Sequence, residues 1–178
     1  MTFGRIGRIA ILVSVAVLLF ALVSPGGSRS SVPKVDPRSG NHDRHCVPVG
    51  GMLMTNFGAI DAATTMGTAT GDLRGAVSGT LLGAPQPGAG GTLVFHVQHH
   101  WVTESGDTLT FDPAVATTIP VQNSQTLFAI VTYPVHITGG TGKFAGAIGD
   151  LKSIGEVDLA AQATVFRYSG QVCFADQD

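Results

Sequence analysis

Apolar and polar residues alternate with a period of two along much of the chain, which is the spacing typical of β-strands. The alternation is clearest from Thr65 to Gly83, where one set of positions carries mainly glycine and aliphatic residues and the other set is mostly polar. Small residues alternating with large ones are typical of the inward face of a small closed barrel. The pattern therefore predicts an all-β domain and favours a barrel over a sandwich.

Strand-like segments continue to the end of the chain, and from Cys46 onward no stretch follows the 3.6-residue period of a helix. Short runs rich in Gly, Pro, Asp and Asn separate these segments. Strands are expected near residues 47–57, 63–70, 73–83, 91–104, 107–112, 125–138, 143–157 and 162–174. Since strands do not alternate with helices, the pattern excludes a Rossmann-like sheet.

The first 27 residues differ in kind from the rest. Arg5 and Arg8 precede an apolar run from Ile9 to Val23 that only Ser14 interrupts. A basic segment followed by a short apolar run is typical of a secretory signal helix. As a helix the run would rise about 22 Å, short of the roughly 30 Å core of a bilayer. The pattern predicts export, with an uncleaved membrane anchor as the alternative.

Three segments follow from this division of the chain: a signal peptide or anchor over 1–27, a flexible linker over 28–45 and a β-barrel domain over 46–178. The linker is rich in Pro, Gly, Ser and charge and has few apolar residues. The mature protein is expected to be secreted or periplasmic. If the anchor stays, the domain is expected to be membrane-attached, facing outside the cytoplasm, with no other membrane contact.

Charge narrows the range of partners. Only 12% of residues are charged and the net charge is −2, so the chain lacks the basic surface that nucleic acid requires. The only two cysteines, Cys46 and Cys173, follow the export segment. In an oxidising compartment such a pair predicts a disulfide between the start and the end of the domain. Two unpaired buried thiols, in a chain that is never oxidised, are the alternative.

A glycine-rich motif covers residues 137–149, where a strand ends in Gly-Gly-Thr-Gly-Lys-Phe-Ala-Gly-Ala. Its Gly139, Gly140 and Gly142 suit a tight connection, and Phe144 is expected to plug the core behind them. The motif resembles the allene oxide cyclase and dirigent β-barrel superfamily. Residues 100–107, 155–159 and 166–170 are similar to its bacterial branch, whose members are mostly uncharacterised.

The resemblance implies a calycin-type, eight-stranded antiparallel barrel that forms a homodimer or homotrimer and needs no cofactor. Members of the superfamily cyclise reactive intermediates or steer radical coupling inside the barrel. The chain would then bind a small hydrophobic molecule and steer its cyclisation or coupling, as an isomerase does. The family's catalytic pattern has no match here, so catalytic residues stay unassigned. The alternative is a structural or surface interaction barrel with a filled interior.

Several polar residues stand among the apolar ones and are candidates for ligand binding. They are His96, His100, Tyr133, His136 and Arg167. On a strand, His96 and His100 are about 13 Å apart, too far to share one metal ion with bonds near 2.1 Å. No metal site is expected. An apolar cavity of about 300 Å³ or more would favour ligand binding over the filled barrel.

The export segment can be tested directly. We expect N-terminal sequencing of the exported protein to begin between Ser24 and Val32, because the peptidase cleaves after the apolar run. Recovery of an intact Met1 in the membrane fraction would contradict cleavage and support the anchor.

Overall fold

The computed structural model describes residues 44–174, so the predicted signal helix over 1–27 and almost all of the linker lie outside the described residues. The described part is built from eleven strands, and every strand pair is antiparallel. The strands are β1 (His45–Phe57), β2 (Thr64–Ala69), β3 (Gly75–Leu81), β4 (Gln86–Pro87), β5 (Leu93–Thr103), β6 (Thr108–Phe111), β7 (Ala114–Pro120), β8 (Leu127–Thr132), β9 (Pro134–Gly140), β10 (Ile148–Asp158) and β11 (Ala163–Phe174). The predicted all-β class is confirmed. Within residues 44–174, no helix has the length and apolarity to cross a bilayer.

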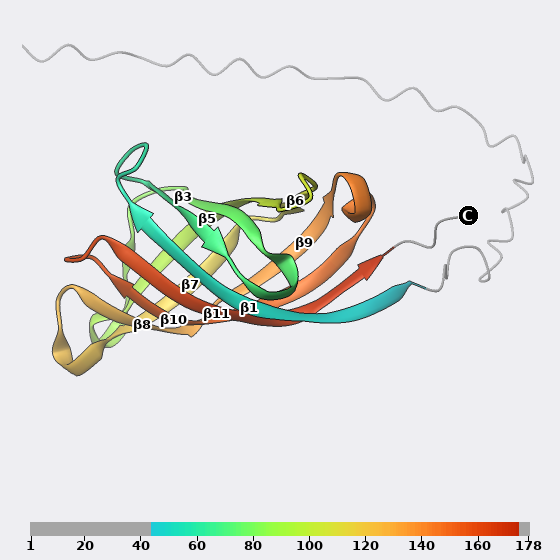
Figure 1. Cartoon of the computed structure of the whole chain (residues 1–178). Helices are drawn as coiled ribbons and strands as arrows, with labels where there is room; N and C mark the ends of the chain where they lie inside the picture. The colour runs from blue at the N-terminus through green and yellow to red at the C-terminus, as the bar shows by residue number, and fades with distance from the viewer. Residues whose placement is uncertain (1–43, 175–178) are drawn as a thin grey trace, which may run out of the picture. The chain divides into compact units, whose positions relative to one another are not determined.

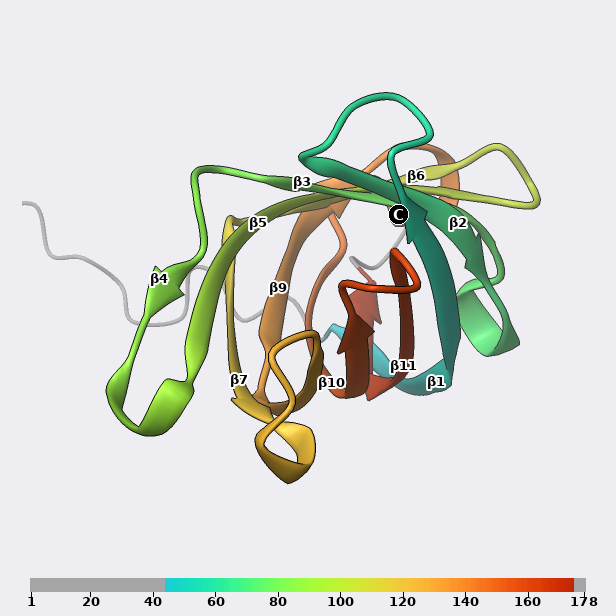
Figure 2. The same ribbon diagram turned by 90° about the vertical axis from the view of Figure 1, so that its left-hand side faces the viewer.

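The strand pairings close on themselves. The path runs β1–β2–β3–β5–β6–β9–β10–β11, and β11 pairs again with β1, which makes a ring of eight strands (Figure 2). β7 continues β6 along β5, and β8 precedes β9 along β10, so these four segments act as two long, interrupted strands. The described residues therefore form a closed ring of eight strands within an all-antiparallel sheet.

The sequence pattern predicts the end of β6 but misses β7. It ends a strand at residue 112, where Asp112-Pro113 is typical of a turn, and assigns no strand to the segment that follows. The chain instead resumes pairing with β5 as β7. Proline has no N–H to donate, and here that gap falls in the break between β6 and β7. The Gln98 side chain bridges the break by donating to the Phe111 carbonyl at 3.1 Å.

The two ends of the ring differ. Because the strands are antiparallel, four loops gather at one end, which we call the mouth: residues 58–63, 82–92, 121–126 and 159–162. The other end, which we call the closed end, carries residues 70–74, 104–107 and 141–147 with the start of β1 and the end of β11. The mouth lies at the left in Figure 1 and faces the viewer in Figure 2.

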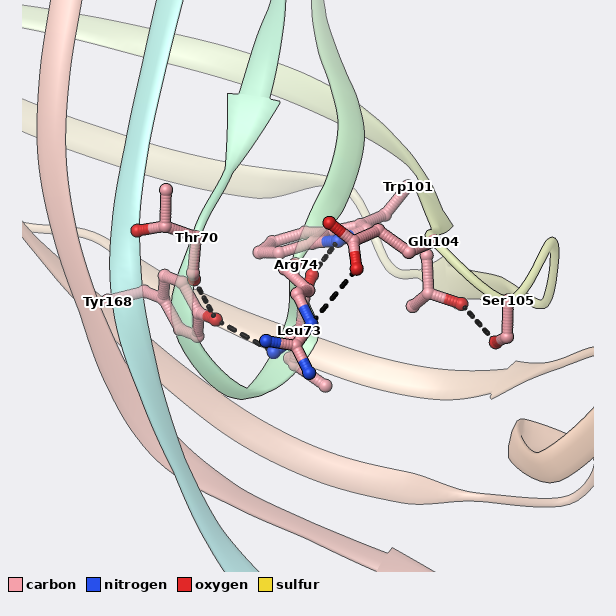
Figure 3. Close-up of polar contacts among 8 residues, drawn as sticks. Thr70, Leu73, Arg74, Trp101, Glu104, Ser105 and Tyr168 are labelled. Carbon is pink, nitrogen blue, oxygen red and sulfur yellow. Dashed lines mark hydrogen bonds and ion pairs between the residues drawn. The ribbon is translucent and has the colours of Figure 1, made fainter.

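The closed end is held by hydrogen bonds from aromatic side chains to the β2–β3 turn (Figure 3). The Tyr168 hydroxyl donates to the Thr70 carbonyl at 2.8 Å and accepts from the Leu73 N–H at 3.0 Å. Trp101 Nε1 donates to the Leu73 carbonyl at 2.7 Å. The rings of Trp101 and Tyr168 meet edge to face, and both side chains are buried. The polar atoms of both buried aromatic side chains therefore have hydrogen-bond partners.

Two further sequence features lie at the closed end. The predicted disulfide between Cys46 and Cys173 is present and joins directly opposed residues of β1 and β11. The glycine-rich motif forms the end of β9 and a short 3-10 turn, η4 (Gly142–Phe144). Gly142 has a φ of 55°, and Phe144 is buried behind it with 1% of its surface exposed. Gly140, in contrast, has no positive φ; a side chain there would collide with the Thr108 carbonyl.

We expect Tyr168→Phe to lower the free energy of unfolding by about 1–3 kcal/mol, because the Thr70 carbonyl and the Leu73 N–H would both lose their partner. Urea denaturation would measure the change. Ser169→Ala is the matched control, since it removes an exposed hydroxyl from the neighbouring position of β11. Equal stabilities of the two variants would contradict this role of Tyr168.

Candidate functional site

The interior of the ring contains two small cavities. The first, which we call the deep cavity, has a volume of about 50 Å³ and is bounded on the closed side by Trp101 and Tyr168. The second, the upper cavity, also measures about 50 Å³ and is lined by Phe57, Leu81 and Phe95 toward the mouth. The two cavities share four wall residues: Thr65, Gly79, Tyr133 and Phe166. They are neighbouring compartments of one interior.

A larger hollow lies at the mouth. It measures about 470 Å³ and shares Phe57, Leu81 and Phe95 with the upper cavity. Its remaining lining comes from the mouth loops: Gly58, Asp61, Ala62, Pro85, Leu159 and Gln162. Because neighbouring hollows share wall residues, the mouth hollow, the upper cavity and the deep cavity follow one another in depth, from the surface inward.

Gly79 on β3 helps to keep the interior open. It lies opposite His99 of β5 and lines both cavities. A Cβ atom at this position would lie 3.1 Å from Val97 Cγ1 and 3.3 Å from Thr65 Oγ1. The set of positions that the sequence pattern assigned to the inward face does face inward here, and the absent side chain of Gly79 leaves space between the cavities.

A hydrogen-bonded pair of polar side chains lines the interior. His99 Nε2 lies 2.7 Å from the hydroxyl of Tyr133, which occupies the break between β8 and β9. Tyr133 is 7% exposed, and aromatic rings surround the pair: Phe111 beside His99, and Phe166 beside Tyr133. The other ring nitrogen, Nδ1, is buried and has no hydrogen-bond partner among residues 44–174. An unpartnered polar atom in a core is uncommon and marks this pair as a candidate site.

Both members of the pair are neutral near pH 7. Burial lowers the pKa of His99 from 6.5 to about 4, because the imidazolium would lose its hydration. Burial raises the pKa of Tyr133 above its ordinary value of 10 for the same reason. No charged side chain lines the deep or the upper cavity. The interior therefore offers hydrogen bonding without charge.

The structure distributes the five candidate residues unevenly. Only Tyr133 lines the cavities. The other four candidates, His96, His100, His136 and Arg167, are exposed on the outer face. His136 pairs there with Asp150. Successive side chains of a strand point to opposite faces of the sheet. The neighbours of these four residues point into the ring, so the four point outward. Their predicted ligand-binding roles stay predictions.

His99 was not among the candidates. Its signal was present in the sequence, because His99 falls on the same strand face as Phe95, Val97 and Trp101, which are buried. A histidine on an apolar face is the one that enters the interior, whereas His96 and His100 share the opposite face. Within residues 44–174, no group of three His, Cys, Asp or Glu side chains is placed to hold a metal ion.

Comparison with known proteins adds little. No family model matches the chain, and no curated protein matches it. Among solved structures, a pterocarpan synthase dirigent protein aligns with 83% of this chain and 99% of its own, at 15% identity and a TM-score of 0.35. So low a TM-score carries no weight for this chain, whose fold is established by its own strand pairing. The finer resemblance to allene oxide cyclases and their bacterial branch stays a prediction.

Acidification provides a test of the His99 environment. Its pKa is lower in the folded protein than the ordinary 6.5, so the unfolded chain takes up a proton first and stability falls as the pH drops from 6.5 toward 4. We expect His99 to account for a loss of about 2 kcal/mol between pH 7 and pH 5. Urea denaturation at both pH values should show that His99→Gln removes this loss, whereas His96→Gln, on the outer face, keeps it.

Proposed function

We propose that this protein is an exported β-barrel that binds a small, largely apolar molecule inside the ring and steers its cyclisation or coupling. One observation carries the proposal: the 470 Å³ mouth hollow shares Phe57, Leu81 and Phe95 with the upper cavity, which Tyr133 of the His99–Tyr133 pair also lines. The volume of the hollow falls within the range of about 300–1,000 Å³ that is typical of ligand sites. The Cys46–Cys173 disulfide fits a protein that works outside the cytoplasm.

Such a site would act mainly by shape. The bulk of the ligand would lie against Phe57, Leu81 and Phe95, while a narrower end would reach the pair in the interior. Walls that hold one folded conformation of a reactive molecule lower the entropic part of the barrier to ring closure or coupling. Exclusion of water would also protect a reactive intermediate from hydrolysis. This mode of action needs few polar groups, and the interior supplies few.

A structural or surface interaction barrel is the second candidate, and the small size of the inner cavities favours it. At about 50 Å³ each, they lie well below the 300 Å³ expected of a ligand site, and buried aromatic side chains fill much of the interior. The two candidates differ in one measurable respect. A ligand-binding barrel loses its ligand when the junction of the cavities is filled, whereas a structural barrel binds nothing there.

We expect natively purified mature protein to carry a small apolar molecule, or to bind Nile red saturably, and Gly79→Val to abolish both. The valine side chain would occupy the space between the two cavities. Native mass spectrometry and fluorescence titration would measure the loss. Ala76→Val is the matched control, because it places the same valine side chain at an exposed position of β3.

Circular dichroism of both valine variants should show the wild-type fold, so that loss of binding reports on the cavity alone. Absence of any bound molecule, together with absence of saturable Nile red binding by the wild type, would overturn the proposal in favour of the structural barrel.

A further inference from the structure

The His99–Tyr133 pair has one more hydrogen than its mutual bond can use. At neutral pH the phenol carries one hydrogen on oxygen and the imidazole carries one on nitrogen. The contact between His99 Nε2 and the Tyr133 hydroxyl consumes one of the two, whichever group is the donor. One hydrogen therefore remains for a third partner.

The two possible donors of that hydrogen differ in their access to the cavities. A proton on Nδ1 would be an N–H that is buried and faces no acceptor among the described residues, which costs about 1–3 kcal/mol. A phenolic O–H without an acceptor costs a similar amount, but Tyr133 lines both cavities. An acceptor that enters the cavities therefore favours the tautomer with the proton on Nε2, in which Nε2–H donates to the Tyr133 oxygen and the phenolic hydrogen is free for that acceptor.

The position of this free donor is significant. Tyr133 lines both the deep and the upper cavity, and within residues 44–174 its hydroxyl makes no hydrogen bond except the one to His99. A phenol that accepts a bond from Nε2–H becomes a stronger donor to its next partner. No cation lines either cavity, so a buried carboxylate would lack compensation for its lost hydration.

We propose that Tyr133 donates a hydrogen bond to an acceptor oxygen of a neutral, mainly apolar ligand, such as a ketone, aldehyde, ester or ether. His99 is a positioning residue, which fixes the phenol and aims its hydrogen at the ligand. This inference rests on the proposed function and specifies the class of molecule that the interior takes. It excludes fatty-acid-like anions as preferred ligands.

Three probes of equal carbon number test the inference: methyl hexyl ketone, octane and octanoate. Their affinities for the full mature protein would be measured by displacement of Nile red. We expect the ketone to bind more tightly than octanoate. Tyr133→Phe should weaken ketone binding by about threefold to tenfold and leave octane binding unchanged, because only one hydrogen bond is lost.

The carbonyl stretch of the bound ketone gives a direct readout that stability changes do not move. In the wild type we expect infrared spectroscopy to show it shifted to lower frequency than in hexane. The shift should vanish in Tyr133→Phe, shrink in His99→Phe and persist in His96→Phe, whose side chain lies outside the ring.

Each outcome separates the two proposals. If neither the ketone nor octane binds the wild type, the proposed function fails. If both bind and the carbonyl stretch in the wild type is unshifted, the interior binds apolar molecules and the role assigned to Tyr133 is overturned. The second measurement needs only the wild-type protein, so it stands even where Tyr133→Phe does not fold.

Discussion

Closure of the ring is the constraint on which every other feature depends. Eight strands can meet edge to edge only if they coil strongly, and strong coiling brings the backbones of neighbouring strands close together. Gly155 of β10 and Gly67 of β2 are two of the positions where this happens, since a side chain at either position would collide with a carbonyl oxygen of the adjacent strand. Glycine at such positions lets neighbouring strands of the ring approach this closely.

The two buried tyrosines of the interior differ in the partners of their hydroxyl groups. The Tyr168 hydroxyl both donates and accepts, and its two partners are backbone groups of a turn. Its bonding capacity serves the closed end. Tyr133 lines both cavities and, within the described chain, its hydroxyl bonds only to His99. The hydroxyl of Tyr168 therefore has two partners, whereas that of Tyr133 has one and keeps bonding capacity for a further group.

Local patterns predicted much of this fold and little of the site. Alternation identified most of the strands, though not β7, and the inward face of β3, and the cysteine pair gave the disulfide. The same alternation could have singled out His99, since it shares a face with Val97 and Trp101. What alternation could not predict was the break at Tyr133, which depends on how β8 and β9 meet β10. The cavity volumes depend on how side chains from opposite strands pack, which one strand's pattern does not contain.

The pairing of the first strand with the last has a consequence for how the chain acquires its structure. Cys46 and Cys173 are 127 residues apart, so the pairing that completes the ring joins the first and the last of the described strands. Folds with such non-local strand pairs form slowly, because the chain loses the conformational entropy of a long loop before the strand pairing stabilises it. When the chain is synthesised or exported from its N-terminus, β1 can pair with β2 early. Its other edge stays unpaired until β11 has emerged. Oxidation of the two thiols then locks this pairing covalently, since Cys46 and Cys173 lie directly opposite each other in the paired strands.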